Sequence, residues 1–390
     1  TPVYDEARVI VEANCNFDEP VTFIIKDGDK EIAKVDGKGA VSIEFPDKQF
    51  KSWTPEHPFL YDLLVVSRRD KVMSYFAMRK FACEYVGKYP RLTLNNKPYF
   101  HNGLLDQGYW SDGLYTAPSD EALVADIALA KRLGFNMLRK HIKIEPLRWY
   151  YHCDRLGMIV WQDMPSGGTK QHKLWTLYLP HFDVWKLKDS NYARFSRAKK
   201  ESRDLFVKEY TEMIHLLYNT PCIAMWVPFN EAWGQFDANE IAALTKKLDP
   251  TRTVDHASGW HDQGGGDIHS LHIYFKPVKL PRDKNNRVTC LTEYGGYSLP
   301  VEGHMFNPDN IYSYKKYEDA ESFNVGIAEL FTRDVINLIP QGLSAAVFTQ
   351  LSDVEDEING LVTFDRKVLK VDEAMMKQLN AQIHITKEWI

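Results

Sequence analysis

The sequence lacks any long hydrophobic run and any excess of positive charge. Its longest apolar stretches, residues 60–66 and 222–229, are much shorter than the roughly 20 residues that a membrane-spanning helix needs. Its 48 basic residues are outnumbered by 53 acidic ones, which gives a net charge of −5, and they form no stripe that would neutralise a phosphate backbone. We therefore predict that neither a membrane nor a nucleic acid is a partner.

Cysteine is scarce as well, with 5 in 390 residues, scattered along the chain. An odd number of widely spaced cysteines in apolar segments favours neither a disulfide framework nor a zinc cluster. His269 and His272 are three residues apart on a predicted strand, so their side chains should face opposite sides of it. A phosphate-binding loop and a Gly-x-Ser-x-Gly nucleophile motif are both absent. We expect no cofactor and no metal.

The first 88 residues have the pattern of an antiparallel β-sandwich. Asp27-Gly28 and Asp36-Gly37 are typical hairpin turns, and the segments around them alternate or are rich in β-branched and aromatic residues. An immunoglobulin-like domain over residues 1–88 fits this spacing. The predicted strands are 8–12, 21–26, 31–35, 40–45, 60–67 and 71–81.

After a predicted linker at residues 87–90, strands alternate with longer helical patterns, which is typical of parallel βα units. Ser119 can cap a helix that buries Leu123, Ile127 and Ala130, and Gly134 stands where such a helix ends. We predict a (β/α)8 barrel over residues 89–390; a doubly wound sheet is disfavoured because no Gly-x-Gly-x-x-Gly follows the first strand. Its strands are predicted at 99–105, 135–140, 158–162, 222–229, 253–257, 268–274, 288–291 and 344–350.

Two of these strands run into glutamate, at Glu231 after the fourth and Glu293 after the seventh. A barrel builds its active site at the carboxyl ends of its strands. Cleavage of a glycosidic bond with retention needs two carboxyl groups about 5 Å apart, one as acid and one as nucleophile. The alternative, that each glutamate merely ends a strand and faces water, is disfavoured because charged groups at a barrel mouth seldom lack a role.

The segments around both glutamates resemble the acid/base and nucleophile motifs of glycoside hydrolase family 2, which contains β-galactosidases, β-glucuronidases and β-mannosidases. The resemblance implies that Glu231 is the general acid/base and Glu293 the nucleophile. It also implies that Asn230 binds the sugar 2-hydroxyl, that Tyr274 contacts the nucleophile and that Arg139 orients the site, although a structural salt bridge explains Arg139 equally well. The similar segments are 53–61, 92–103, 134–139, 153–157, 161–163, 230–234 and 292–296.

Further polar residues follow or close predicted strands and are candidates for reading sugar hydroxyls or for supporting the residues that do. We interpret five of them as substrate-binding residues: Asp106, Asp163, Trp260, His272 and Gln350.

Departures from the family pattern narrow the expected substrate. Family members that act on glucuronides carry Asn-x-Lys shortly after strand eight, whereas this chain has Asn359-Gly360-Leu361. The metal-binding histidine that follows strand three in the best-known β-galactosidases is missing from residues 163–167. We therefore expect a retaining exo-β-glycosidase for neutral sugars that is β-galactosidase-like. A β-mannosidase, indicated by Trp161-Gln162-Asp163, and a non-catalytic carbohydrate-binding fragment are the alternatives.

The resemblance also leads to expectations about further domains, partners and cellular location. The family normally begins with a jelly-roll domain, so a chain that starts at the immunoglobulin-like domain is expected to be a fragment. The expected partner is a glycoside or oligosaccharide, and a homo-oligomer is compatible with the sequence. A signal before the missing domain would imply a periplasmic or secreted protein, and its absence a cytoplasmic one.

Overall fold

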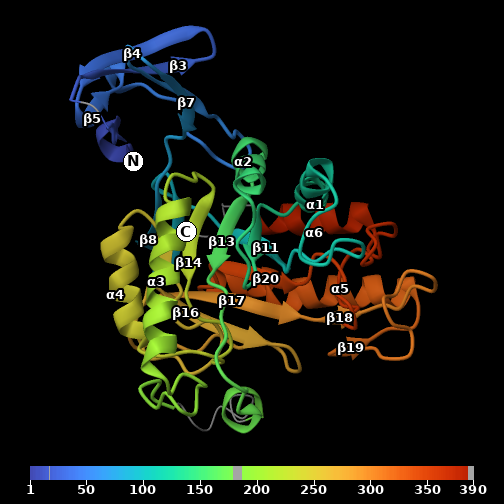
Figure 1. Ribbon diagram of the computed structural model, residues 1–390. Coiled ribbons are helices and arrows are strands. Elements are labelled where there is room, and N and C mark those ends of the chain that lie inside the picture. Colours follow the sequence, from blue (N-terminus) through green and yellow to red (C-terminus); the bar gives the residue numbers. More distant parts are fainter. Residues whose placement is uncertain (17, 179–186, 385–390) are drawn as a thin grey trace.

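The computed structural model describes residues 1–16, 18–178 and 187–384. A β-sandwich built from the first part of the chain lies at one end of a larger barrel (Figure 1). Both predicted architectures are confirmed. No helix within the described ranges is long and apolar enough to cross a membrane.

The sandwich consists of a three-stranded sheet in the order β1-β2-β5 and a four-stranded sheet in the order β4-β3-β6-β7. Alternate residues of these strands point into a shared core that contains Val9, Phe23, Ile25, Ile43 and Tyr61, as the period of two requires. The strands are β1 (Pro2–Val3), β2 (Arg8–Ala13), β3 (Val21–Asp27), β4 (Lys30–Gly37), β5 (Gly39–Glu44), β6 (Tyr61–Val66) and β7 (Lys71–Phe76).

The predicted linker at residues 87–90 is wrong, because these residues form the turn and first pairs of a hairpin. Strands β8 (Phe81–Val86), β9 (Tyr89–Leu94) and β10 (Lys97–Pro98) make an antiparallel sheet. Phe81, Leu92 and Leu94 are buried in the same hydrophobic core as the barrel. The domain boundary at residue 88 stays a prediction, and it falls between two paired strands whose side chains both pack into the barrel core.

Eight parallel strands form the barrel, in the order β15-β14-β13-β12-β11-β20-β17-β16. Strands β15 and β16 are not paired as neighbours. Instead, Asp267 bridges them, since its backbone N–H donates to Val254 O at 2.8 Å and its Oδ2 accepts from Val254 N at 2.8 Å. The strands are β11 (His101–Asp106), β12 (Met137–Lys140), β13 (Ile159–Asp163), β14 (Ile223–Val227), β15 (Thr253–Val254), β16 (Ile268–Ile273), β17 (Val288–Gly295) and β20 (Ala345–Thr349).

Helices follow six of the eight strands. Ser119 caps α1 as predicted, because its hydroxyl accepts a hydrogen bond from Ala122 N. The connections 255–267 and 274–287 carry no α-helix, and Arg287 joins them through ion pairs with Asp262 at 2.7 Å and Asp283 at 2.8 Å. The helices are α1 (Asp120–Arg132), α2 (Leu147–Leu156), α3 (Lys200–Leu217), α4 (Ala238–Leu248), α5 (Ala320–Asp334) and α6 (Glu373–Ile383), and two short strands, β18 (Tyr297–Ser298) and β19 (Lys315–Lys316), lie between β17 and α5.

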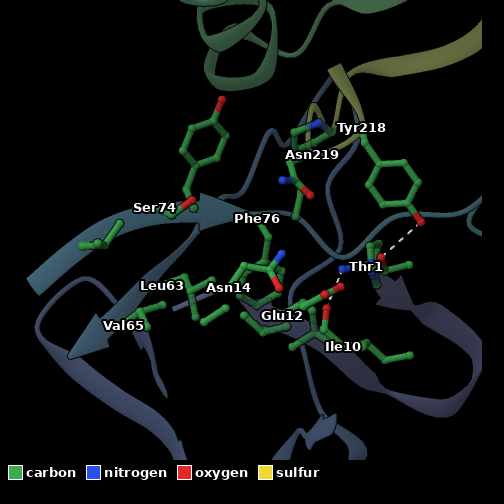
Figure 2. A pocket seen from close by; sticks show the side chains of 18 of the residues that line it. Thr1, Ile10, Glu12, Asn14, Leu63, Val65, Ser74, Phe76, Tyr218 and Asn219 are labelled. Carbon is green, nitrogen blue, oxygen red and sulfur yellow. Dashed lines mark hydrogen bonds between the residues drawn. The ribbon is translucent and has the colours of Figure 1, made fainter. Parts of the chain in front are cut away.

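A cavity of about 1140 Å³ lies where the sandwich meets the barrel, lined by residues of β2, β6 and β7 and by Tyr218 and Asn219 (Figure 2). Tyr218 and Asn219 precede β14, so they mark the end of the barrel at which its parallel strands begin. Active sites of such barrels form at the opposite end. This cavity is therefore separate from the glutamates.

Candidate active site

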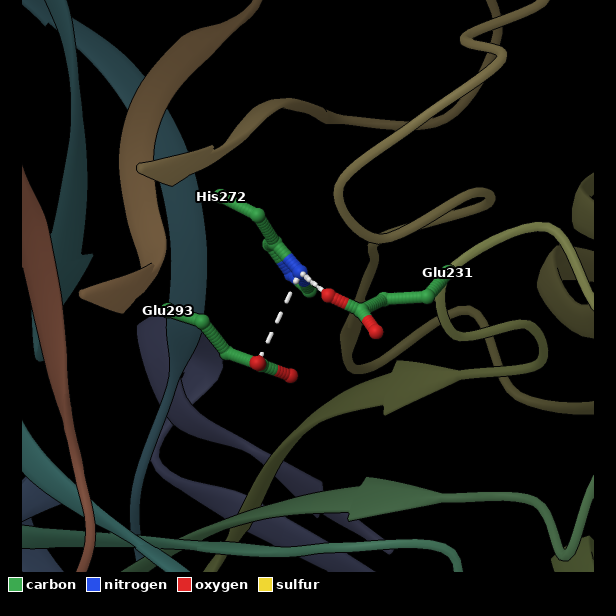
Figure 3. Close-up of side chains that lie close together, drawn as sticks. All are labelled: Glu231, His272 and Glu293. Atoms are coloured by element: carbon green, nitrogen blue, oxygen red, sulfur yellow. Dashed lines mark hydrogen bonds and ion pairs between the residues drawn. The ribbon is translucent and has the colours of Figure 1, made fainter. Parts of the chain in front are cut away.

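Glu231, His272 and Glu293 meet at the carboxyl ends of β14, β16 and β17, with the imidazole between the two carboxylates (Figure 3). His272 Nδ1 lies 3.0 Å from Glu231 Oε1 and 3.6 Å from Glu293 Oε2. One oxygen of each glutamate and one nitrogen of the histidine all lie within 4.8 Å of one another. The structure thus brings together the two glutamates that the sequence singled out.

β-Bulges and left-handed backbone conformations orient the side chains of both glutamates. Strand β17 carries one extra residue, Thr292, relative to β16, and β14 carries one, Ala224, relative to β13. Such bulges bend a strand and redirect the side chains that follow. Glu231 and Ala232 have φ values of 46° and 64°, a left-handed conformation that costs non-glycine residues energy and is concentrated at functional sites.

The two carboxylates differ in their access to solvent. The Glu231 side chain is 27% exposed, whereas that of Glu293 is 5% exposed. A solvent-accessible carboxyl can exchange protons with water, and a buried one held by fixed donors is kept in a single orientation. The arrangement suits a proton-transferring group at Glu231 and an oriented nucleophile at Glu293.

Arg139 is the fully buried centre of the site's hydrogen bonds. It makes a bidentate pair with Asp163 at 3.0 Å, and its Nη1 donates to Glu293 Oε1 at 3.0 Å. Its Nη2 also donates to Asn230 Oδ1 at 2.8 Å. Burial alone would lower the pKa of Arg139, but the charges of Asp163 and Glu293 outweigh burial and raise it, so the guanidinium stays charged.

Two predicted sugar-site residues are oriented by these contacts. Arginine only donates hydrogen bonds, so the oxygen of the Asn230 amide faces Arg139 and its N–H groups face away. The hydroxyl of Tyr274 donates to Glu293 Oε2 and lies 3.1 Å from Thr349 Oγ1. Burial raises the pKa of Tyr274 well above its usual value, and the charge of Glu293 adds to that effect. Tyr274 therefore keeps its proton and remains a donor.

His272 is neutral near neutral pH. Burial lowers its pKa to about 4, with the charges of Arg139 and His141 acting in the same direction and that of Glu293 opposing them. Its Nε2 lies 3.1 Å from Ser258 Oγ. Because a carboxylate only accepts hydrogen bonds, Nδ1 carries the proton while Glu231 is ionised, and Nε2 then accepts from the Ser258 hydroxyl.

Three further predicted substrate-binding residues, Asp163, Trp260 and Gln350, contact different groups. Asp163 contacts Arg139, and Trp260 meets the His272 ring edge-on at 6.3 Å between centroids. Gln350 donates to Asn359 Oδ1 at 2.6 Å and accepts from Gln107 Nε2 at 2.9 Å.

Asp106 is the candidate that the structure does not bring to the glutamates. It pairs in register with Lys140, and their charged groups lie 2.6 Å apart. Lys140 also lies over the ring of Trp149 in α2, so both side chains face the outer helices. The physical reason is strand alternation, which turns Lys140 outward where its neighbour Arg139 turns inward.

Sequence reasoning missed four polar residues near the site: His141, Ser258, Thr349 and Glu357. His141 Nδ1 lies 3.3 Å from Asp163 Oδ2, and Glu357 Oε2 accepts from both Gln107 and Gln350. Ser258 and Glu357 lie in loops that return to the barrel mouth. His141 and Ser258 directly follow predicted strands and Thr349 lies within one, so their positions were signals available in the sequence, whereas Glu357 had none.

The trio of Glu231, His272 and Glu293 also has the donor types that a divalent cation accepts, two carboxylates and a neutral imidazole. Among the described residues it is the one group of three or more such side chains whose donor atoms lie so close together. A cation at this position would occupy both carboxylates, which glycoside cleavage needs free.

A family model described as glycosyl hydrolases family 2, TIM barrel domain, matches residues 88–385. The match covers most of the chain, and the chain belongs to glycoside hydrolase family 2.

The relatives and solved structures agree with this membership. A β-galactosidase from Leuconostoc mesenteroides is 26% identical over 236 residues, which are 59% of this chain and 20% of that protein. One from Vibrio vulnificus is 26% identical over 222 residues, 56% of this chain and 19% of that protein. The chain thus spans about a fifth of the length of these curated relatives.

Two solved structures share the fold. A GH2 β-galacturonidase from Eisenbergiella tayi bound to galacturonate gives a TM-score of 0.65 at 18% identity, over 97% of this chain and 67% of that one. A β-D-glucuronidase from Dictyoglomus thermophilum gives 0.73 at 16% identity, over 98% of this chain and 67% of that one.

Proposed function

We propose that this protein hydrolyses terminal neutral β-linked sugars with retention of configuration, with Glu293 as nucleophile and Glu231 as general acid/base. The observation that carries the proposal is the spacing of the two carboxylates, whose nearest oxygens lie within 4.8 Å of each other. Retaining enzymes place their carboxyl groups about 5 Å apart, whereas inverting enzymes leave roughly 6.5–9.5 Å for a water molecule.

In the first step Glu293 attacks the anomeric carbon while the glycosidic C–O bond breaks, and Glu231 gives its proton to the leaving oxygen. In the second step Glu231 removes a proton from water, the water oxygen bonds to the anomeric carbon, and the bond to Glu293 breaks. Arg139 and Tyr274 hold the Glu293 carboxylate in line. The N–H groups of Asn230, which face away from Arg139, then donate to the sugar 2-hydroxyl, and the contact of Asn230 Oδ1 with Arg139 supports this role.

A β-galactoside is the first substrate to test, because the curated relatives are named β-galactosidases. A β-mannoside is the second, because residues 161–163 are similar to mannosidases. Within that motif Trp161 donates to His101 Nδ1 and Gln162 donates to Lys143 O, so only Asp163 reaches Arg139. A panel of nitrophenyl glycosides separates these substrates from each other and from a non-catalytic, carbohydrate-binding fragment, which would turn over none of them.

The roles of the glutamates are tested by the stereochemistry of azide products. Glu231→Ala should keep far more activity on a dinitrophenyl glycoside than on a natural one, because a good leaving group departs without a proton. Azide should then attack the covalent intermediate and give the β-glycosyl azide. For Glu293→Ala, azide should attack the substrate directly and give the α-azide.

The exposed Glu302→Ala is the matched control and should behave as wild type. An α-azide from the Glu231 variant, or wild-type rates in both variants, would overturn the assignment.

A further inference from the structure

A third carboxylate, that of Glu357, is fixed at the catalytic end of the barrel. It lies in the loop after β20, where its backbone exchanges two hydrogen bonds of 2.9 Å with Val354 and forms a bridge with Tyr312. Its Oε2 accepts from Gln107 Nε2 and Gln350 Nε2, each at 3.1 Å. Two amide donors on one oxygen hold the half-buried carboxylate in a defined orientation. The other carboxylate oxygen, Oε1, has no hydrogen-bond partner among the described residues.

This carboxylate lies on the nucleophile's side of the site. Gln350 follows Thr349, whose hydroxyl contacts Tyr274, and Tyr274 donates to Glu293. Burial raises the pKa of Glu357, the charge of Glu293 raises it further, and His141 and the two amides oppose them. The Glu357 carboxyl is therefore within electrostatic reach of Glu293.

The sheet order shows which part of a sugar would face Glu357. Strand β20 lies beside β17, which carries Glu293, and across the barrel from β14, which precedes Glu231. Under the proposed function the scissile oxygen points to Glu231 and the anomeric carbon lies over Glu293. The ring hydroxyls on the far side of the glycone then project toward β20 and β11, where Glu357 is held.

The charges around this position disfavour an anionic sugar. Among the described residues, Asp163, Glu293 and Glu357 are acidic groups at the site beside the proton donor Glu231, and the guanidinium of Arg139 is already bound to Asp163, Glu293 and Asn230. A second carboxylate placed next to Glu357 would meet a like charge. A sugar hydroxyl would instead donate a hydrogen bond to its free oxygen.

We propose that Glu357 is a specificity-determining residue that accepts a hydrogen bond from a glycone hydroxyl and rejects β-linked uronic acids. The inference rests on the proposed function and adds the residue that selects neutral sugars. No strand or motif in the sequence points to Glu357, because it reaches the site only through the folding of its loop.

The test compares kcat/KM for p-nitrophenyl β-galactoside, β-mannoside, β-glucuronide and β-galacturonide in the full chain. Glu357→Gln keeps the shape and an oxygen for the two amides but removes the charge. We expect its kcat/KM on the best neutral glycoside to fall about 10- to 100-fold. Its activity on the uronides should be unchanged or higher, so the ratio of neutral to uronide turnover falls at least tenfold.

The exposed Glu355 in the same loop supplies the matched control, and Glu355→Gln should keep the wild-type ratio. Glu357→Asp retains the charge but withdraws the oxygen, so it should lose activity on neutral sugars and still reject uronides. Urea unfolding of each variant identifies loss of fold. An unchanged ratio in a folded Glu357→Gln variant, or a wild-type protein that prefers a uronide, would overturn the proposal.

If no glycoside in the panel is cleaved, the proposed function fails. The role of Glu357 in sugar recognition is then tested separately by measuring sugar binding. Isothermal titration with galactose, mannose, glucuronate and galacturonate should show a neutral sugar bound more tightly than the uronates by the wild-type chain, with a smaller difference for Glu357→Gln. Equal preferences in the two proteins would reject the role of Glu357.

Discussion

The guanidinium of Arg139 donates to Oε1 of Glu293 at 3.0 Å, from a position with no exposure to solvent. The same side chain holds Asp163 and Asn230. One residue of strand β12 therefore fixes the positions of three polar groups on β13, on β17 and after β14. A planar group with five donors can make all of these bonds at once, and an ammonium group cannot.

This geometry predicts the effect of Arg139→Lys. We expect kcat/KM to fall at least about 100-fold, because at least two charge-assisted hydrogen bonds of roughly 1.5–3 kcal/mol each are lost. The free energy of unfolding should also fall by a few kcal/mol, since buried carboxylates lose their partner. Steady-state kinetics and urea unfolding measure the two effects.

Arg132→Lys is the control, because Arg132 is 54% exposed and pairs with Glu373 on the surface. Such pairs contribute about 0–1 kcal/mol, so this variant should resemble the wild type. If Arg139→Lys stayed within threefold of wild-type activity, the central role of the guanidinium would be wrong.

The buried imidazole of His272 should make stability depend on pH. Its pKa is lowered from 6.5 to about 4 in the folded state, mainly by burial. Between these values the unfolded chain binds a proton that the folded chain does not, so stability rises with pH and is lost as pH falls from about 6.5 to 4. The contribution is about 3 kcal/mol at most.

Urea unfolding at several pH values checks this expectation. His272→Gln should lose less stability than the wild type as pH falls from 6.5 to 4. Tyr314→Phe, which removes a hydroxyl from the ring stacked on Tyr274 and leaves His272 in place, should keep the wild-type slope. Equal slopes for the His272 variant and the wild type would contradict a neutral buried imidazole.

Activity should survive exhaustive removal of metal ions. The chemistry proposed for Glu231 and Glu293 uses proton transfer and covalent attack, and a cation bound between them would block both. We expect kcat/KM to be the same before and after treatment with EDTA and gel filtration. A large loss that magnesium restores would show that the Glu231, His272 and Glu293 trio binds a metal during catalysis, and loss of manganese binding in Glu231→Gln would locate it there.

Local sequence patterns determined the two architectures and the two glutamates. The change from a period of two to alternating strand and helix patterns predicts a sandwich followed by a barrel, because side-chain burial follows the geometry of each element. Strand polarity then places Glu231 and Glu293 at one end, since all parallel strands of a barrel end on the same side. Arg139, Asn230 and Tyr274 follow from their positions beside these strand ends and from the family resemblance.

Only the tertiary structure decided which side chains face the interior of the barrel at the site. The bulges at Ala224 and Thr292 reverse which side chains face the interior, and no local signal marks them because they depend on the neighbouring strands. Asp106 ends a strand as predicted, yet alternation turns it toward Lys140 and away from the barrel interior. Glu357 reaches the site through a loop whose path depends on a bridge with Tyr312, far away in the sequence, and such a long-range contact cannot be read from the residues beside it.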